Sequence, residues 1–160
     1  MKKIGVVSDT HSKPLPLQML DNFKGVDLIL HAGDICSPDI LEDLKEIKEV
    51  KAVYGNMDEH EIRQLFPKRQ IIKYGSFSIG LYHGGGHPEG LLAMVKKELR
   101  NEKVDAVVFG HSHQPFNQEI DGVLYFNPGS PTDTVFAPYP SYGILELGDK
   151  IIGKIVKVRP

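Results

Sequence analysis

The stretch 104–113, VDAVVFGHSH, joins a strand pattern to a candidate site. Its first six residues are rich in apolar and β-branched types, which predicts a buried strand. Gly110 then frees the backbone, and His111 and His113 follow with one residue between them. Neutral imidazole is a common metal ligand, and side chains at positions i and i+2 of a turning segment can be held near one point. A His-x-His pair directly after a buried strand therefore indicates a metal site.

Four further strands upstream also end in polar side chains that bind metals. Short apolar runs predict strands at 3–7, 28–30, 51–54 and 77–82. The polar groups that follow them are, in order, Asp9-x-His11, Gly33-Asp34, Asn56-x-Asp58 and His83. Ligands of an open α/β sheet bind beyond the carboxyl ends of its strands, so these turns are expected to meet at one edge. Neighbouring glycines permit the tight turns and close approach that such a site requires.

Helical patterns alternate with the first of these strands. Apolar spacing predicts a short helix within 15–23, a second after Ser37-Pro38, which form an N-cap and a first helical proline, and a third over 88–100. The alternation of strand and helix is typical of an α/β domain with parallel pairing.

The last third of the chain has a different pattern. Besides a strand at 71–74, which precedes the strand at 77–82, four strands are predicted in this last part, at 118–120, 123–126, 142–147 and 151–158. The last four form two hairpins, around Asp121-Gly122 and Gly148-Asp149, and are expected to make a β-meander. The chain is thus predicted to be one domain, residues 1–160, with two packed sheets.

The composition is that of a globular protein with no strong charge bias. The 160 residues are 41% hydrophobic and 25% charged, with a formal net charge of -2. That balance gives no general attraction to nucleic acid or anionic membranes, and no run approaches the ~18 apolar residues of a membrane span. One cysteine, Cys36, excludes an internal disulfide, and the first residues lack a secretory pattern. We therefore expect a cytoplasmic protein, either alone or as a homo-oligomer.

The candidate ligands offer oxygen and nitrogen atoms, with no thiolate among them. Such sets suit divalent ions such as Mn²⁺, the expected ion, or Ni²⁺, Co²⁺, Fe²⁺ or Zn²⁺. Seven ligands are too many for one ion but suit two ions about 3.5–4 Å apart that share a carboxylate.

The ordered polar motifs resemble the signature of the calcineurin-like metallophosphoesterases. They are Asp9-x-His11, Gly33-Asp34, Gly55-Asn56-x-Asp58, His83-Gly84 and Gly110-His111-x-His113. The chain length and the later Asn127-Pro128-Gly129-Ser130 are similar to the small bacterial and archaeal phosphodiesterase branch. The resemblance implies a four-layer α/β/β/α sandwich of two mixed β-sheets flanked by helices. It also implies one ion held by Asp9, His11 and His113, a second held by Asn56, His83 and His111, and Asp34 as the bridge.

The function so implied is a metal-dependent phosphoesterase, and more specifically a phosphodiesterase acting on a small phosphate ester. A metal-bound hydroxide would attack phosphorus in line. The residues assigned to catalysis are Asp34, Asn56, Asp58 and His83. Two alternatives remain open: a non-catalytic protein-interaction scaffold of the same fold, and a nuclease. A nuclease would need a basic groove with aromatic side chains, whereas the lysines and arginines here are dispersed among acids, so no nucleic-acid partner is expected.

Met57 departs from the family pattern, in which many members have a histidine after the motif asparagine. Methionine cannot protonate a leaving group, and the loss of a general acid costs roughly 10²–10⁴ in rate. The departure favours esters whose leaving group needs no proton. His60 and His87 are hypothetical replacements, and Asp58 is expected to orient a neighbouring ligand.

Three other features have two interpretations each. His31 is either a satisfied core histidine or a support for a ligand. Gly84 to Gly86 either present backbone N–H groups to phosphate or form a plain turn. Asn127 to Ser130 either contact substrate or only turn the chain.

Overall fold

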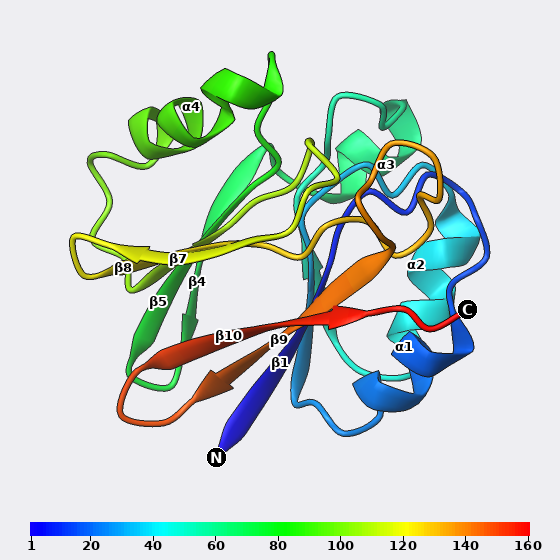
Figure 1. Cartoon of the computed structure of the whole chain (residues 1–160), viewed down its shortest axis with the longest axis horizontal. Coiled ribbons are helices and arrows are strands. Elements are labelled where there is room, and N and C mark those ends of the chain that lie inside the picture. The colour runs from blue at the N-terminus through cyan, green and yellow to red at the C-terminus, as the bar shows by residue number, and fades with distance from the viewer.

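Two five-stranded mixed sheets face each other in the computed structural model, which describes residues 1–160 (Figure 1). The first sheet has the order β10-β9-β1-β2-β3, with β1 at Lys2–Val7, β2 at Leu28–His31, β3 at Val50–Ala52, β9 at Ser141–Leu147 and β10 at Ile151–Lys157. The second has the order β4-β5-β6-β8-β7, with β4 at Arg69–Tyr74, β5 at Phe77–Tyr82, β6 at Ala106–Val108, β7 at Phe116–Ile120 and β8 at Val123–Asn127.

Helices cover the outer face of each sheet (Figure 1). The first sheet carries α1 at Leu17–Phe23, α2 at Pro38–Lys45 and α3 at His60–Leu65. The second carries α4 at Leu91–Glu98, preceded by a short 3-10 turn, η1, at Pro88–Gly90. The predicted N-cap of α2 is present, since Ser37 Oγ accepts a hydrogen bond of 3.2 Å from Asp39 N. The predicted four-layer α/β/β/α sandwich is therefore confirmed.

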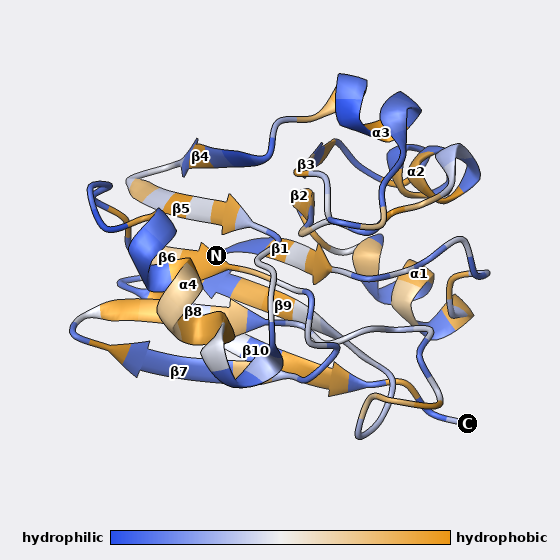
Figure 2. Ribbon diagram, turned by 90° about the horizontal axis from the view of Figure 1, so that it is seen from above, coloured by the Kyte–Doolittle hydropathy of each residue, from blue (hydrophilic) through white to orange (hydrophobic).

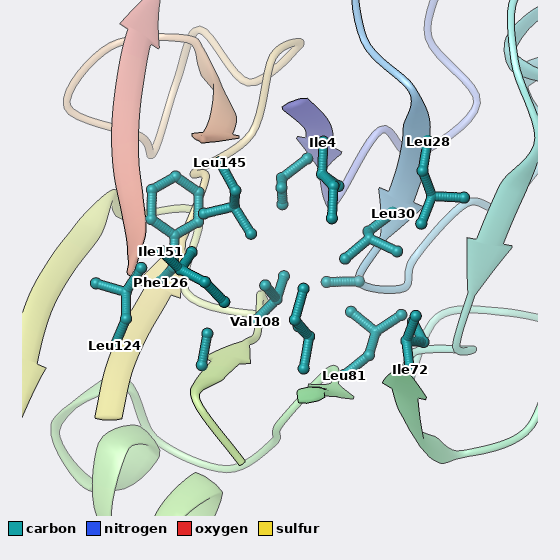
Figure 3. Packing of buried hydrophobic residues seen from close by; sticks show 14 of the residues in the cluster. Ile4, Leu28, Leu30, Ile72, Leu81, Val108, Leu124, Phe126, Leu145 and Ile151 are labelled. Carbon is teal, nitrogen blue, oxygen red and sulfur yellow. The ribbon is translucent and has the colours of Figure 1, made fainter. Parts of the chain in front are cut away.

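Alternating side chains of the strands build the core on both faces of each sheet. In β2, Leu28 and Leu30 point between the sheets, whereas Ile29 points toward the helices. Between the sheets, side chains such as Ile4, Leu81 and Phe126 meet in one apolar cluster (Figure 3). The ribbon coloured by hydropathy shows β8 largely hydrophobic, whereas the edge strands β4 and β7 and the helix α3 are largely hydrophilic (Figure 2). None of the helices has both the length and the apolar character that a bilayer crossing requires.

The parallel strands of each sheet end level with one another. In the first sheet, Val7 of β1 pairs with His31 of β2, which pairs with Ala52 of β3. In the second, Leu81, Val108 and Phe126 align across β5, β6 and β8 in the same way. The loops that follow these strands therefore start at the same height and meet along one edge of the sandwich.

The predicted β-meander is wrong. The two hairpins form around the expected turns, but β7 and β8 join the second sheet, with β8 parallel to β6, whereas β9 and β10 join the first sheet beside β1. Turn chemistry identifies which strands pair locally but not which sheet receives the pair. The proline-containing segment 128–140 between the hairpins is long enough to cross from one sheet to the other.

The helix α3 was not predicted, because its only buried residue is Ile62. A single apolar position in a charged run gives no helical stripe. The predicted ends of the other elements are also shifted: the helix expected over 88–100 is the turn η1 followed by α4, with Leu91, Val95 and Leu99 buried as the spacing indicated.

Candidate metal centre

Every predicted ligand lies in a loop at the carboxyl end of a parallel strand. Asp9 and His11 follow β1, Asp34 follows β2 and Asn56 follows β3, all in the first sheet. His83 follows β5, and His111 and His113 follow β6, in the second sheet. The sequence predicted that these turns meet at one edge of an open sheet. The five strands are instead divided between two sheets. The site therefore lies where the edges of two facing sheets meet.

One group of potential ligands surrounds Asp9 Oδ1. His113 Nε2 lies 3.4 Å from this oxygen and His11 Nε2 lies 3.7 Å from it. The other carboxylate oxygen, Oδ2, accepts hydrogen bonds from Ser8 Oγ at 2.7 Å and from His111 N at 3.0 Å. Asp9 Oδ1 and His11 Nε2 are buried polar atoms without a hydrogen-bond partner. Because such atoms are rare in folded proteins, they indicate a place for a cation.

A second group surrounds the side-chain oxygen of Asn56. Asn56 Oδ1 lies 3.0 Å from His83 Nε2 and 3.2 Å from His111 Nδ1. The opposite ring nitrogens donate to backbone carbonyls, His83 Nδ1 to Ala32 O at 2.7 Å and His111 Nε2 to Gly86 O at 2.8 Å. A donated proton on one ring nitrogen leaves the other available as a ligand, which is how metal-binding histidines are oriented.

Asp34 lies between the two groups. Its Oδ2 is 3.4 Å from His11 Nε2 and 3.4 Å from His83 Nε2. Its Oδ1 accepts a hydrogen bond of 2.8 Å from Met57 N, which fixes the rotation of the carboxylate. A single carboxylate thus contacts both histidine sets, the arrangement that two ions with a shared ligand require.

The backbone of the site is strained. Left-handed φ angles occur at Asp9 (59°), Asp34 (57°) and His111 (74°), and also at His11 and His113. Such conformations are uncommon in residues other than glycine and cluster at functional sites, where the surrounding structure holds them in place. Five of the seven predicted ligands share this feature, so the backbone strain of these loops is concentrated at the candidate ligands.

Buried residues behind the ligands hold the loops in place. Asp58 accepts hydrogen bonds from Asp34 N at 2.9 Å, Gly55 N at 2.8 Å and Cys36 N at 2.7 Å. Its carboxylate is therefore occupied by three backbone donors, which fits the orienting role and not contact with a substrate. His31 is fully buried and connects the first two loops, accepting from Gly33 N and bonding to Thr10 Oγ1 at 3.1 Å. Burial lowers the pKa of His31 to about 3, so it is a neutral core histidine that also supports the ligand loops.

The two histidines considered as proton donors, His60 and His87, lie outside the ligand cluster. His60 is exposed at the start of α3, and His87 caps η1 by accepting from Glu89 N, so neither hydrogen-bonds to the ligand cluster. Burial and the carboxylate of Asp58 raise the pKa of Cys36 to about 12, which keeps its thiol protonated. Gly86 positions His111 through its carbonyl, as described above.

The segment Asn127 to Ser130 braces the site from the second sheet. Asn127 Nδ2 donates to Gly110 O at 3.0 Å, and Ser130 Oγ donates to Asp9 O at 2.8 Å. Both side chains are fully buried, so they hold the ligand loops. Figure 1 shows the orange segment after β8 beside the blue segment after β1.

Two residues of the site were missed from the sequence. Asp133 Oδ2 lies 2.6 Å from His113 Nδ1, which orients the imidazole so that Nε2 faces Asp9. Arg63 in α3 donates to the backbone carbonyls of Asp58 at 2.6 Å and Asn56 at 3.3 Å. Neither lies in a recognisable motif, because both act through contacts between segments distant in the chain.

Charge complementarity inside the cluster shifts several pKa values. Burial alone would raise the pKa of Asp9, but the neighbouring histidines, His83 first, hold it well below its ordinary value. Burial opposes protonation of His83, yet Asp9 and Asp34 outweigh it and raise its pKa to about 9. The hydrogen bond to Asp9, with a further one to Asp133, raises the pKa of His113 to about 9 against the effect of its burial. In the absence of a metal, protons on these two rings thus balance the carboxylates.

Metal binding is expected to release protons. Ions bind neutral imidazole, whereas His83 and His113, with pKa values of about 9, are protonated at pH 7 without metal. Affinity should therefore rise with pH up to about 9, by as much as ~100-fold per unit if both protons are displaced. Calorimetric titration of Mn²⁺ in buffers of different ionisation enthalpy measures the number of protons released.

The metal-free protein provides the control, because its stability should change with pH in the opposite direction. The pKa values of about 9 are raised above the unfolded value of about 6.5, so the two histidines stabilise the fold fully below pH ~6.5. This contribution is lost as the pH rises through 9, and urea unfolding in a chelator should show the decline. Metal affinity that is independent of pH, with no proton release, would contradict the assignment.

The substitution Asp133→Asn is expected to weaken metal binding by about 10–100-fold. An amide nitrogen facing His113 Nδ1 would move the ring proton to Nε2, the nitrogen that faces Asp9. Calorimetry with Mn²⁺ measures the change, and Asp149→Asn, in the exposed β9–β10 turn, is the matched control. Unchanged affinity in Asp133→Asn would show that this contact does not orient a ligand.

The four-layer fold carries a cluster of nitrogen and oxygen atoms at its strand ends that could hold metal ions. Residues 1–150 match the calcineurin-like phosphoesterase superfamily domain. The chain therefore belongs to the calcineurin-like phosphoesterase superfamily, as its ordered motifs predicted.

Curated relatives agree with this assignment. A "Probable metallophosphoesterase" of Methanothermobacter thermautotrophicus is 38% identical over 159 residues, covering 96% of this chain and 91% of the relative. A "Phosphodiesterase" of Methanocaldococcus jannaschii is 26% identical, covering 96% of this chain and 98% of the relative.

Solved structures share the fold along nearly the whole chain. Vacuolar Protein Sorting 29 of Cryptosporidium parvum superimposes with a TM-score of 0.84 at 26% identity, covering 99% of this chain and 92% of that one. Vps29 of Entamoeba histolytica, solved in complex with zinc, has a TM-score of 0.75 at 28% identity, with coverage of 98% and 99%.

Proposed function

We propose that the protein is a metal-dependent phosphodiesterase with a dinuclear centre bridged by Asp34. The observation that carries this proposal is the position of Asp34 Oδ2, 3.4 Å from both His11 Nε2 and His83 Nε2. Asp9, His11 and His113 would hold one ion, and Asn56, His83 and His111 the other. Mn²⁺ is the expected ion, because the ligands are nitrogen and oxygen atoms and include no thiolate.

The ions would supply positive charge for the phosphoryl oxygens and lower the pKa of a coordinated water toward ~7, which gives a hydroxide nucleophile. The residues of this chain would position that chemistry. Asp34 would set the distance between the two groups of ligands. Asn56, after β3, and His83, after β5, would belong to the second group. Asp58 acts behind them, through its hydrogen bonds to Asp34 N and Gly55 N.

Met57 supports a diester substrate. The residue is 57% exposed, its backbone N–H donates to Asp34 Oδ1, and its thioether side chain offers no proton to a departing oxygen. Neither His60 nor His87 hydrogen-bonds to the ligand cluster, so no histidine replaces the missing donor there. Esters with leaving groups that depart without protonation are therefore the expected substrates.

A non-catalytic scaffold is the second candidate function. The likeness to Vps29 structures at 26–28% identity favours it. The chain retains all of its predicted histidine ligands in one cluster, as hydrolysis requires, but the zinc complex of one Vps29 means that metal binding alone does not separate the two functions. We further propose that residues 1–160 act as one domain in the cytoplasm, in keeping with a single free cysteine.

Hydrolysis of bis(p-nitrophenyl) phosphate tests the proposed activity. Turnover is expected with added Mn²⁺, loss of turnover after chelation, and recovery when Mn²⁺ is returned. Activity that persists in excess chelator would contradict the metal mechanism. Tight binding of Mn²⁺ without turnover of any diester would favour the scaffold.

A further inference from the structure

A cavity of about 260 Å³ adjoins only one side of the ligand cluster. It opens beside Asp9, His11 and His113, and none of Asn56, His83 or His111 lines it. Its outer wall includes Lys13, Val135 and Phe136. The volume is somewhat below the roughly 300–1,000 Å³ of pockets that take drug-sized ligands, so it suits one substituent rather than an entire large substrate.

Two adjacent large apolar side chains in this wall are exposed to solvent. Val135 is 73% exposed and Phe136 is 85% exposed. Isolated exposed apolar residues are common, but an adjacent pair at the rim of a polar site is typical of a binding surface. An aromatic ring in this position offers a flat apolar face to a planar partner.

The exposure of this pair does not result from a loose loop. Asp133 Oδ1 accepts hydrogen bonds from Val135 N at 2.8 Å and Phe136 N at 2.9 Å, and Oδ2 accepts from Ala137 N at 3.1 Å. Thr132 Oγ1 also donates to Thr10 O at 3.0 Å, in the loop that follows β1. The backbone that carries the two apolar side chains is therefore tied to the ligand loops on both sheets.

The same carboxylate links the wall to the metal centre. Asp133 Oδ2 bonds to His113 Nδ1 at 2.6 Å while Oδ1 holds the Val135–Phe136 backbone. The position of the apolar pair relative to His113 is thus fixed by one side chain. Lys13 adds an exposed ammonium to the same cavity, which favours an anionic group beside the apolar wall.

We propose that Val135, Phe136 and Lys13 form a subsite for the planar aromatic group of a phosphate ester. The proposal rests on the proposed phosphoesterase function and adds the class of substituent. The phosphoryl group would lie at the ligand cluster, the aromatic group would stack on Phe136, and Lys13 would attract the negative charge of the ester. An aryl group and a nucleobase share this chemistry.

Calorimetric binding of two phosphonates to the Mn²⁺-loaded protein tests the subsite without turnover. The wild type should bind phenylphosphonate roughly tenfold more tightly than methylphosphonate, within the range that aromatic stacking contributes. Phe136→Ala should reduce this ratio to about 2, and Phe136→Tyr should retain it. Lys13→Met should weaken both phosphonates by a similar factor, because charge attracts each of them.

A matched control and a second ligand pair complete the design. Leu17→Ala removes an apolar side chain that is 78% exposed and does not line the cavity, so it should leave the ratio unchanged. Comparing adenosine 5′-monophosphate with ribose 5-phosphate measures the preference for a nucleobase, and the larger of the two ratios identifies the source of the aromatic group.

Equal affinity of the wild type for both members of each pair would overturn the subsite alone, as would a preference that survives in Phe136→Ala. Failure of every phosphate and phosphonate to bind the Mn²⁺-loaded wild type would overturn the proposed function and the subsite together.

Discussion

The substitution Asp34→Asn should reduce Mn²⁺-dependent diester hydrolysis by about 10³-fold. The amide places an N–H₂ group where Oδ2 now lies, 3.4 Å from His11 Nε2 and from His83 Nε2. It therefore removes the shared ligand, and metal ions supply several kcal/mol of transition-state stabilisation, with each ~1.4 kcal/mol worth tenfold in rate. The measurement is kcat/KM at saturating Mn²⁺.

The fold should tolerate this change. The amide oxygen can still accept the 2.8 Å hydrogen bond from Met57 N, and asparagine tolerates the left-handed φ of 57° at this position better than most residues. Asp43→Asn, on the exposed side of α2, is the matched control and should keep full activity. If Asp34→Asn kept more than a tenth of the wild-type activity with an unchanged metal count, the bridging role would be wrong.

Gly55→Ala should both destabilise the metal-free protein and abolish tight metal binding. A Cβ at Gly55 would overlap Asp34 Oδ1 and lie 2.6 Å from Asp34 N. Forcing an atom into a packed site costs about 1–3 kcal/mol, and relief of this contact requires a shift of both the bridging carboxylate and the backbone that carries it. Urea unfolding in a chelator measures the stability, and Mn²⁺ calorimetry measures the binding.

Gly90→Ala is the control for this prediction. A Cβ there meets no atom within 4 Å, and the φ of -96° suits any residue. Its stability should be unchanged or increased by about 0.4–1 kcal/mol, and its metal affinity should equal that of the wild type. Equal metal affinity in Gly55→Ala and Gly90→Ala would show that the ligands do not depend on the close approach of the β2 and β3 loops.

Local patterns predicted an α/β domain with two sheets, and the motif resemblance added the four-layer order of the fold. Apolar runs identify the buried strands, and parallel pairing aligns the turns after β1, β2 and β3 in one sheet and after β5 and β6 in the other. The packing of the two sheets, which local patterns do not specify, brings the two sets of turns together. The strand-terminal glycines, such as Gly55 and Gly110, were recognisable from local patterns as well.

The features that the sequence did not predict depend on contacts between distant segments. Whether β9 joins the first or the second sheet is decided by packing beside β1, not by its own turn. Asp133 orients His113 from a loop that contains no motif, and Arg63 reaches the Asn56 loop from a helix with one buried apolar residue. Hydrogen bonds across the fold leave no periodic signal in the chain.

Anomalous diffraction from crystals of the Mn²⁺-loaded protein tests the central claim most directly. Two manganese peaks about 3.5–4 Å apart are expected, with Asp34 Oδ2 between them, Asp9 beside one and Asn56 beside the other. A single peak, or two peaks that Asp34 does not join, would contradict the dinuclear centre.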